Sequence, residues 1–452
     1  MQPTYLPRHI DSVLESWQLE AHPKPLILRG ARQTGKSSSV RALGAKFPLF
    51  LELNLERRAD LALVRACRSP EELLAALRVR HDLHELPKPT LLFLDELQES
   101  PEAISWLRFF REEHPDVRVI GAGSLLEVRL AERGFSFPVG RVTFRALHPF
   151  SFFEFARAVG AGVLVDTLSA DWRALPPVHH EQAMELLRQY LAVGGMPEAV
   201  SRWVETREPL TVRQVHADLL QAFAEDIQKY RLRDTAYVEA AFEALPHHYG
   251  QRFHYTDFAP GYRTEPMKRA LDRLESAMIV TRVWPTSSLA LPLKRRPRSA
   301  PKLLPLDIGL ALHGMGVRFG DPSSPPVEQL LDGRAAEICV GQQLLSEQEG
   351  PREPLHFWVR ETARANAELD YLLATRGRCV PVEVKAGPSG RLRSLHQFLR
   401  RAGADTAFRL HGGMPSDEQH EVEVDGQRLR YRLLTLPLYL AERLPSIAAE
   451  IG

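Results

Sequence analysis

The chain has 452 residues, more than a single hydrophobic core ordinarily serves, so its length predicts two to four domains. Its 44% hydrophobic and 25% charged residues are typical of a soluble globular protein, and a formal net charge of +1 excludes a strong overall field for nucleic acid. The 3 cysteines lack CxxC spacing, which excludes a disulfide framework and a cysteine-rich zinc site.

The first residues, MQPTYLPRHIDSV, lack the apolar segment that a signal peptide requires. No run of apolar residues in the sequence is long enough to span a bilayer. Together with the low cysteine content, these features predict a cytoplasmic protein without a membrane partner.

The stretch KPLILRGARQTGKSSSVRALGAKF predicts a buried strand over residues 25–28, a glycine-containing loop and then a helix. A P-loop requires this context, because backbone N–H groups and the helix N-terminus together surround phosphate oxygens. Lys36 would reach the β- and γ-phosphates, and the Ser37 hydroxyl would bind Mg²⁺. We therefore predict an ATP and Mg²⁺ site formed by Gly30, Ala31, Arg32, Gln33, Thr34, Gly35, Lys36, Ser37 and Ser38.

The stretch TLLFLDELQES predicts a second buried parallel strand, formed by Leu91 to Leu94. Asp95 ends this strand and is expected to hold Mg²⁺ through water. Glu96 follows directly and would polarise the attacking water, which indicates a hydrolase. The alternative for Glu96 is an acidic residue that interacts with a helix dipole.

A third strand is predicted in VRVIGAGSLL, with Ser124 near its carboxyl end, where α/β sheets hold ligands. Ser124 is either a polar sensor of the γ-phosphate or an ordinary helix N-cap. Farther along, Arg141 follows a glycine in FPVGRVTF. It is either an arginine finger, acting in cis or on a neighbouring subunit of an oligomer, or a surface arginine.

Residues 151–205 have a helical pattern and predict a helical lid, in which EQAMELLRQYLAVGG is an amphipathic helix ended by two glycines. Residues 206–320 predict further helices followed by a hairpin, as in a winged helix. The stretch SSLALPLKRRPRSAPK would lie near the hairpin tip and is the densest basic patch of the chain. Its cations either contact DNA phosphates or belong to a solvated loop or a contact with an acidic partner. They are Lys294, Arg295, Arg296, Arg298 and Lys302.

The stretch GDPSSPPVEQ predicts a linker before a last domain at residues 328–452. There Asp370 lies in a strand, Glu383 and Lys385 lie on the next strand of a β-meander, and Glu337 would complete their site from a predicted helix. Adjacent strands are about 4.8 Å apart, so Asp370 and Glu383 can converge on one Mg²⁺. Lys385 would orient or deprotonate water, as in a PD-(D/E)xK nuclease site. The alternative is a solvated strand face with an ion pair.

Several strings of this sequence resemble a known group of AAA-like, STAND-related ATPases of archaea and bacteria. They are RGARQTGKSS, LLFLDELQ, GAGSLL, VGRVTFRALHPFSFFEF, YLAVGGMPEAV and PKLLPLDIGLA, and the resemblance extends from near residue 5 to the C-terminus. In that group an AAA domain precedes a domain of unknown function, DUF4143, and the resemblance implies a C-terminal domain similar to the PD-(D/E)xK nuclease fold. Here Ile338 follows Glu337, where related chains commonly carry asparagine.

The fold expected is therefore α/β, with a P-loop ATPase core at residues 1–150, the lid, the winged-helix-like domain and a restriction-endonuclease-like domain. Two functions of different classes follow from it. The first is an ATP-hydrolysing machine that acts on DNA through a Mg²⁺-dependent nuclease domain, in genome defence, mobile-element handling or repair. The second is a nucleotide-dependent switch or scaffold whose nuclease-like domain binds a protein or DNA partner without cleaving it.

Overall fold

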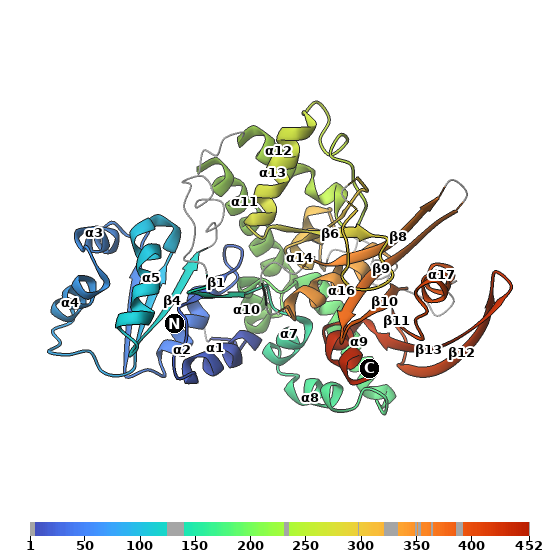
Figure 1. Ribbon diagram of the computed structural model, residues 1–452, viewed down its shortest axis with the longest axis horizontal. Coiled ribbons are helices and arrows are strands. Elements are labelled where there is room, and N and C mark those ends of the chain that lie inside the picture. Colours follow the sequence, from blue (N-terminus) through green and yellow to red (C-terminus); the bar gives the residue numbers. More distant parts are fainter. Residues whose placement is uncertain are drawn as a thin grey trace. The chain divides into compact units, whose positions relative to one another are not determined.

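The computed structural model describes residues 5–123, 140–229, 235–296, 298–320, 333–348, 350, 354–362, 365–385 and 392–451. The chain forms two compact units. The N-terminal unit consists mainly of Met1–His148, and the C-terminal unit mainly of Pro149–Glu275, Ile279–Glu347 and Glu353–Gly452. Figure 1 shows the helices and strands of each unit, coloured along the sequence.

The N-terminal unit is built on a five-stranded sheet in the order β2-β3-β4-β1-β5, in which all pairings are parallel. Its strands are β1 (Leu26–Arg29), β2 (Leu49–Asn54), β3 (Thr90–Asp95), β4 (Val117–Gly123) and β5 (Thr143–Ala146). Its helices are α1 (His9–Leu19), α2 (Lys36–Gly44), α3 (Arg58–Ala66), α4 (Pro70–Arg80) and α5 (Pro101–Glu113). The predicted strands over residues 25–28 and 91–94 are confirmed.

Both faces of this sheet are buried, which explains the uninterrupted apolar run in β3. Leu91 and Phe93 pack with residues of α1 and α2 on one face. Leu92 and Leu94 pack with residues of α3, α4 and α5 on the other. Because all strands are parallel, the carboxyl ends of β1, β3 and β4 lie at one edge of the sheet, where the P-loop and Asp95 follow their strands.

The C-terminal unit contains an eight-stranded mixed sheet in the order β12-β13-β11-β10-β9-β8-β6-β7. Its strands are β6 (Val280–Thr286), β7 (Lys302–Pro305), β8 (His356–Thr362), β9 (Ala365–Thr375), β10 (Arg378–Val384), β11 (Thr406–His411), β12 (Ser416–Val424) and β13 (Gln427–Pro437). Its helices are α7 (Phe152–Ala158), α8 (Gly162–Ala170), α9 (Pro177–Val193), α10 (Pro197–Thr206), α11 (Pro209–Lys229), α12 (Thr235–His248), α13 (Thr264–Ser276), α14 (Ile308–Gly314), α16 (Arg334–Ser346), α17 (Arg393–Ala402) and α18 (Leu444–Ile451).

The predicted hairpin of the middle region is present as the antiparallel pair β6 and β7. This pair continues the sheet of the last domain, because β6 also pairs in parallel with β8. The predicted β-meander is β8, β9 and β10, which pair in an antiparallel way in chain order. One sheet thus runs across the predicted boundary at residues 320–328, most of which lies outside the described residues.

The glycine pair that ends α9 occupies a crowded turn. Gly194 has a φ of 73°, which favours glycine, and a Cβ on Gly195 would meet the Phe150 carbonyl oxygen at 2.1 Å. The Gly195 N–H donates to Asp307 Oδ2 at 2.6 Å, and burial raises the pKa of Asp307 to about 6. Three motif strings that are distant in the sequence therefore meet here, and this supports a structural role for the turn.

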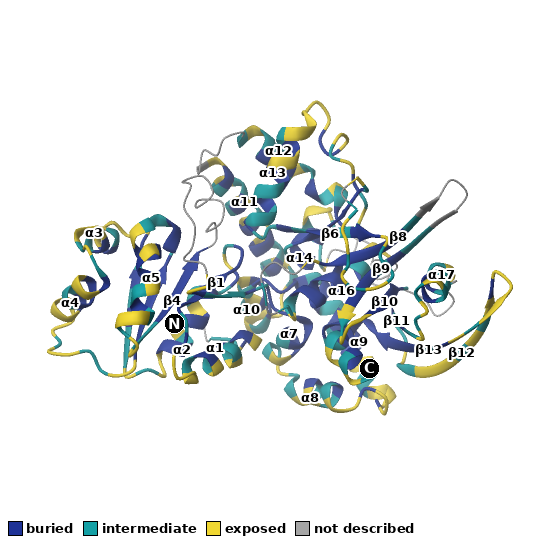
Figure 2. Ribbon diagram, viewed as in Figure 1, coloured by how far each residue is buried: buried dark blue, intermediate teal, exposed yellow. Residues whose placement is uncertain are grey.

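The buried residues follow most strands of both sheets, whereas β12 is largely exposed and α3 and α4 show exposed faces (Figure 2). Within the described ranges, no helix combines the length and the apolar character needed to cross a membrane.

Candidate functional site

The P-loop connects β1 to α2 and takes the conformation that its glycines allow. Gly35 caps α2 with a φ of 94°, and Gln33 has a φ of 63°. A Cβ on Gly30 would meet the Leu147 carbonyl oxygen at 2.5 Å, so only glycine fits there without movement of the backbone. The loop therefore approaches neighbouring backbone closely, as a phosphate cradle requires.

Lys36 begins α2 and has its ammonium group inside the loop. Its Nζ donates to the carbonyl oxygens of Gly30 at 3.0 Å and Ala31 at 2.8 Å. Burial lowers the pKa of Lys36 to about 8, against the opposing effect of the Glu96 and Asp95 carboxylates. A phosphate would offer this ammonium the charged partner that carbonyl groups do not provide.

Ser37 and Asp95 are brought together as predicted, with the Ser37 Oγ donating to Asp95 Oδ2 at 2.8 Å. Hydroxyl and carboxylate oxygens are ligands that Mg²⁺ prefers, so this pair fits a magnesium ion bound with a nucleotide. Glu96 follows with a φ of 51° and accepts a hydrogen bond from Gln98 Nε2. Burial raises the pKa of both carboxyl groups.

Of two further predicted residues of this unit, one lies outside the described residues and the other is not brought to the P-loop. Ser124 lies outside the described residues. Arg141 precedes β5 and forms an ion pair with Glu112 at 2.8 Å. Since β5 starts beside Leu26, Arg141 is at the amino edge of the parallel sheet, opposite the edge that carries the P-loop. This position argues against Arg141 acting as an arginine finger in its own subunit. Its action as an arginine finger on a neighbouring subunit stays a prediction.

Arg8 is a P-loop neighbour that sequence reasoning missed. Its Nη1 donates to the Thr34 carbonyl oxygen at 3.2 Å, and its Nη2 donates to the His148 carbonyl oxygen at 2.7 Å. Arg8 thus links the loop to the segment that follows β5. The sequence carries no motif around Arg8 that could have indicated this contact.

The four residues predicted as a nuclease-like site do lie near one another in the C-terminal unit. Asp370 on β9 accepts a hydrogen bond at Oδ2 from the Val384 N–H at 2.8 Å, beside Glu383 on β10. Lys385 Nζ pairs with Glu383 Oε1 at 2.6 Å. Glu337 reaches this cluster from α16, and its carboxylate interacts electrostatically with Asp370.

A lysine that sequence reasoning placed elsewhere completes this cluster. Lys302, the first residue of β7, directs its Nζ to Glu337 Oε1 at 2.6 Å, to Glu368 Oε1 at 2.7 Å and to Asp370 Oδ1 at 3.7 Å. Its side chain is only 5% exposed. Glu368 was also missed, although it precedes Asp370 by two residues on β9 and so shares its face.

The charges of this cluster shift one another's ionisation. Burial alone would lower the pKa of Lys302, but Glu337, Asp370 and Glu368 raise it well above its usual range. Burial raises the pKa of Glu337 and of Glu383. Within the described ranges, no group of three or more His, Cys, Asp or Glu side chains is arranged to hold a metal ion. The Lys302 ammonium thus lies among the carboxylates of this cluster, and the Mg²⁺ predicted at Asp370 and Glu383 stays a prediction.

The predicted basic patch needs one correction. Lys294, Arg295 and Arg298 are exposed in the connection between β6 and β7, and Arg296 is half-buried. The Arg295 guanidinium lies over the Trp284 ring, 4.6 Å from its centroid. Lys302 is not part of this surface, because β7 places it inside the unit against carboxylates.

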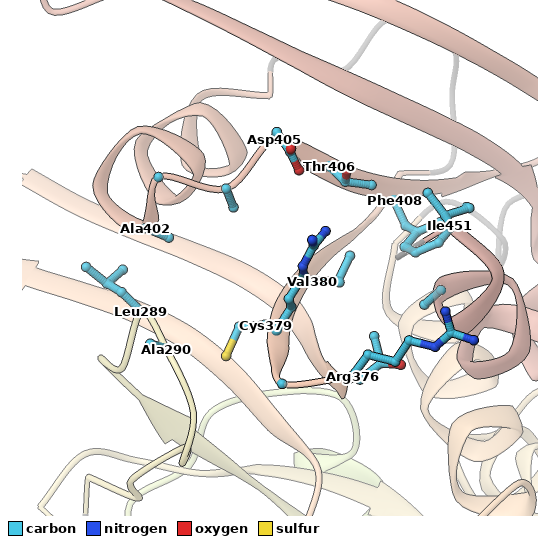
Figure 3. Close-up of a pocket in the computed structure, with 16 residues that line it drawn as sticks. Leu289, Ala290, Arg376, Cys379, Val380, Ala402, Asp405, Thr406, Phe408 and Ile451 are labelled. Atoms are coloured by element: carbon cyan, nitrogen blue, oxygen red, sulfur yellow. Dashed lines mark hydrogen bonds between the residues drawn. The ribbon is translucent and has the colours of Figure 1, made fainter.

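A separate cavity of about 380 Å³ lies at the β9–β10 turn. Arg376 of that turn, Asp405 and Thr406 at the start of β11, and Ile451 of α18 line it (Figure 3). None of the predicted site residues lines this cavity. It is thus distinct from the carboxylate cluster of the same unit.

Three segments of the chain match known domain families. Residues 22–156 match an AAA domain, residues 184–319 match a domain of unknown function, DUF8612, and residues 332–431 match the domain of unknown function DUF4143. The N-terminal unit thus has the fold and the sequence signature of an AAA-like P-loop ATPase, as predicted. No protein with a curated description matches the chain.

Three solved structures show partial similarity to this chain. The Walker-type ATPase PABY2304 of Pyrococcus abyssi is 15% identical, with a TM-score of 0.44, covering 69% of this chain and 96% of that one. PCH-2 of C. elegans is 13% identical, with a TM-score of 0.25, covering 39% and 52%. The Pif1 helicase from Bacteroides, in complex with ADP-AlF3 and ssDNA, is 13% identical, with a TM-score of 0.23, covering 42% and 50%.

Proposed function

We propose that this protein is a nucleotide-dependent switch: it binds and hydrolyses ATP in the N-terminal unit, and its nuclease-like C-terminal domain binds a partner without cleaving it. The observation that carries the ATPase part is the convergence of Lys36, Ser37, Asp95 and Glu96 at one edge of the parallel sheet. The buried lysine among the C-terminal carboxylates supports the absence of cleavage.

Each residue of the N-terminal site would have a distinct task. The Lys36 ammonium would hold the terminal phosphates, and the P-loop N–H groups would surround them. Ser37 and Asp95 would hold the magnesium ion, and this ion would neutralise negative charge on the phosphates. Glu96 would accept a hydrogen bond from the attacking water and align it with the γ-phosphate.

A test separates ATP binding from hydrolysis. Glu96→Gln is expected to keep ATP binding but to reduce phosphate release by about 100-fold or more, because the amide does not polarise water. Glu99→Gln, on the same short connection, is the matched control and is expected to hydrolyse ATP as the wild type does. Unchanged hydrolysis by Glu96→Gln would remove Glu96 from the proposed site.

A second candidate is Mg²⁺-dependent DNA cleavage coupled to ATP hydrolysis. The proximity of Asp370, Glu383 and Lys385 favours it, since these residue types on adjacent strands can form a phosphodiesterase site. The exposed cations Lys294, Arg295 and Arg298 would then contact DNA phosphates.

One cleavage assay distinguishes the two candidates. Plasmid and linear DNA are incubated with Mg²⁺ or Mn²⁺, with and without ATP, using the wild type, Lys36→Ala and Lys385→Ala. We expect no cleavage in any lane while the wild type hydrolyses ATP. Cleavage that is lost only in Lys385→Ala would instead establish an ungated nuclease, and loss in both variants would establish coupling to ATP.

A further inference from the structure

The carboxylate cluster of the C-terminal unit contains its own cation. Four acidic side chains come together from three elements: Glu337 from α16, Glu368 and Asp370 from β9, and Glu383 from β10. The Lys302 ammonium pairs with two of them at 2.6 and 2.7 Å and lies 3.7 Å from a third. We infer that Lys302 takes the place of a divalent metal ion in this nuclease-like site and so keeps the site free of metal.

The position of Lys302 is set by the sheet and does not depend on a mobile loop. Its backbone pairs with Val283 in the β6–β7 ladder and forms a bridge with Arg252 on its other side. Its Nζ lies 4.9 Å from the centroid of the Phe357 ring, which adds a cation–π interaction. The backbone of Lys302 is thus held on both sides, and its ammonium is held by the carboxylates and the Phe357 ring.

Several oxygens of these carboxylates are engaged by protein groups, whereas Glu383 Oε2 is buried and has no hydrogen-bond partner. Asp370 Oδ2 accepts from the Val384 N–H, and Glu383 Oε1 pairs with Lys385. A second cation, Arg252, lies 3.6 Å from Glu368 Oε2. A divalent ion bound here would have to displace these partners. It would also lie next to the buried Lys302 ammonium, and two positive charges in close contact inside a protein repel strongly.

This arrangement differs from that of a metal site that is ready for its ion. Such a site presents oxygen ligands that converge on one point and repel one another until the cation arrives. Here the ammonium supplies that positive charge permanently. The inference therefore predicts that a neutral side chain at position 302 uncovers a cation site in an otherwise intact cluster.

Metal binding to the full-length, nucleotide-free protein tests this inference. Mn²⁺ is titrated into the wild type and into Lys302→Gln, and bound Mn²⁺ is followed from the loss of the free-ion electron paramagnetic resonance signal. We expect Lys302→Gln to bind Mn²⁺ at least about tenfold more tightly than the wild type does, because the repelling ammonium is gone. Mn²⁺ should also raise the thermal unfolding midpoint of Lys302→Gln but not that of the wild type.

Three further variants make the result specific. Asp370→Asn in the Lys302→Gln background should abolish the gained binding. Lys268→Gln makes the same change on the exposed face of α13 in the same unit and should behave as the wild type. Asp370→Asn alone should leave Mn²⁺ binding of the wild type unchanged, and this comparison decides the question even if Lys302→Gln does not fold.

Two results would overturn the inference. One is Mn²⁺ binding by the wild type that Asp370→Asn removes, and the other is a folded Lys302→Gln that gains no binding. ATP hydrolysis is not a readout here, so a failure of this inference is distinguishable from a failure of the proposed ATPase function.

Discussion

Each unit of this molecule buries a lysine among acidic groups, and the two lysines differ in what satisfies the ammonium. Lys36 donates to carbonyl oxygens of the P-loop, and burial lowers its pKa to about 8. Lys302 pairs directly with carboxylates, which raise its pKa despite its burial. The first cation is thus left for an anionic ligand, whereas the second is already neutralised by its own chain.

The largest expected effect is the loss of ATP hydrolysis when Lys36 of the N-terminal unit is replaced. Lys36→Ala should reduce ATP hydrolysis by at least about 100-fold, because the cation that would hold the terminal phosphates is lost. Its free energy of unfolding should change by no more than about 1 kcal/mol, since the ammonium has no carboxylate in direct contact. Phosphate release and urea denaturation measure the two quantities.

Lys46→Ala is the control for that variant, because Lys46 is an exposed lysine just beyond the same helix, paired with Glu15. It should hydrolyse ATP at the wild-type rate. Hydrolysis by Lys36→Ala within about threefold of wild type would mean that the P-loop does not bind the terminal phosphates through this residue.

For Lys302 in the C-terminal unit we expect a large loss of stability and no direct effect on ATP binding. Lys302→Met should lower the free energy of unfolding by about 3–5 kcal/mol, because breaking a buried ion pair leaves carboxylates without their cation. ATP binding should persist wherever the variant is folded. Urea denaturation with Lys268→Met as control measures the effect, and a loss below about 1 kcal/mol would show that the carboxylates do not depend on this ammonium.

Glu442 extends the comparison to a buried carboxyl group held by a backbone N–H, which Phe153 donates to Oε2 at 3.1 Å. Burial raises its pKa to about 8, with Glu347 and Glu154 adding to the effect. Between about pH 4.5 and pH 8 the folded state therefore binds more protons at this residue than the unfolded state does. Its contribution to stability is present below about pH 4.5 and is lost as the pH rises through about 8.

Glu442→Gln imitates the protonated form at every pH. It should therefore be more stable than the wild type at pH 9, by about 3 kcal/mol, and nearly equal to it at pH 5. Denaturation curves at both pH values test this. Equal stabilities at pH 9 would mean that the wild-type carboxyl group is ionised in the folded protein without a penalty.

The smallest effect is expected at Arg141. Because Arg141 pairs with Glu112 and lies at the amino edge of the sheet, Arg141→Ala should change ATP hydrolysis by less than about twofold. An arginine finger supplied by a neighbouring subunit would instead cost about 10³-fold or more. Measuring hydrolysis over a range of protein concentrations separates these outcomes.

Local patterns predicted much of the fold. The P-loop residues are contiguous, so their glycines and the following helix indicate the phosphate cradle without knowledge of distant contacts. The apolar run before Asp95 indicates a strand buried on both faces, and the structure confirms it. The amphipathic pattern up to Val193 and the two glycines likewise predicted the end of α9.

The sequence by itself determined where strands, helices and the phosphate loop lie, because these depend on the spacing of nearby residues. Only the tertiary structure decided which charges meet. Lys302 belongs to a basic run in the sequence, yet β7 carries it beside α16 and β9, and Arg8 reaches the P-loop from before α1. Such contacts join residues that are far apart in the chain. The energy of an ion pair depends on the distance between the two charges in space, and the sequence positions of the residues do not reveal that distance.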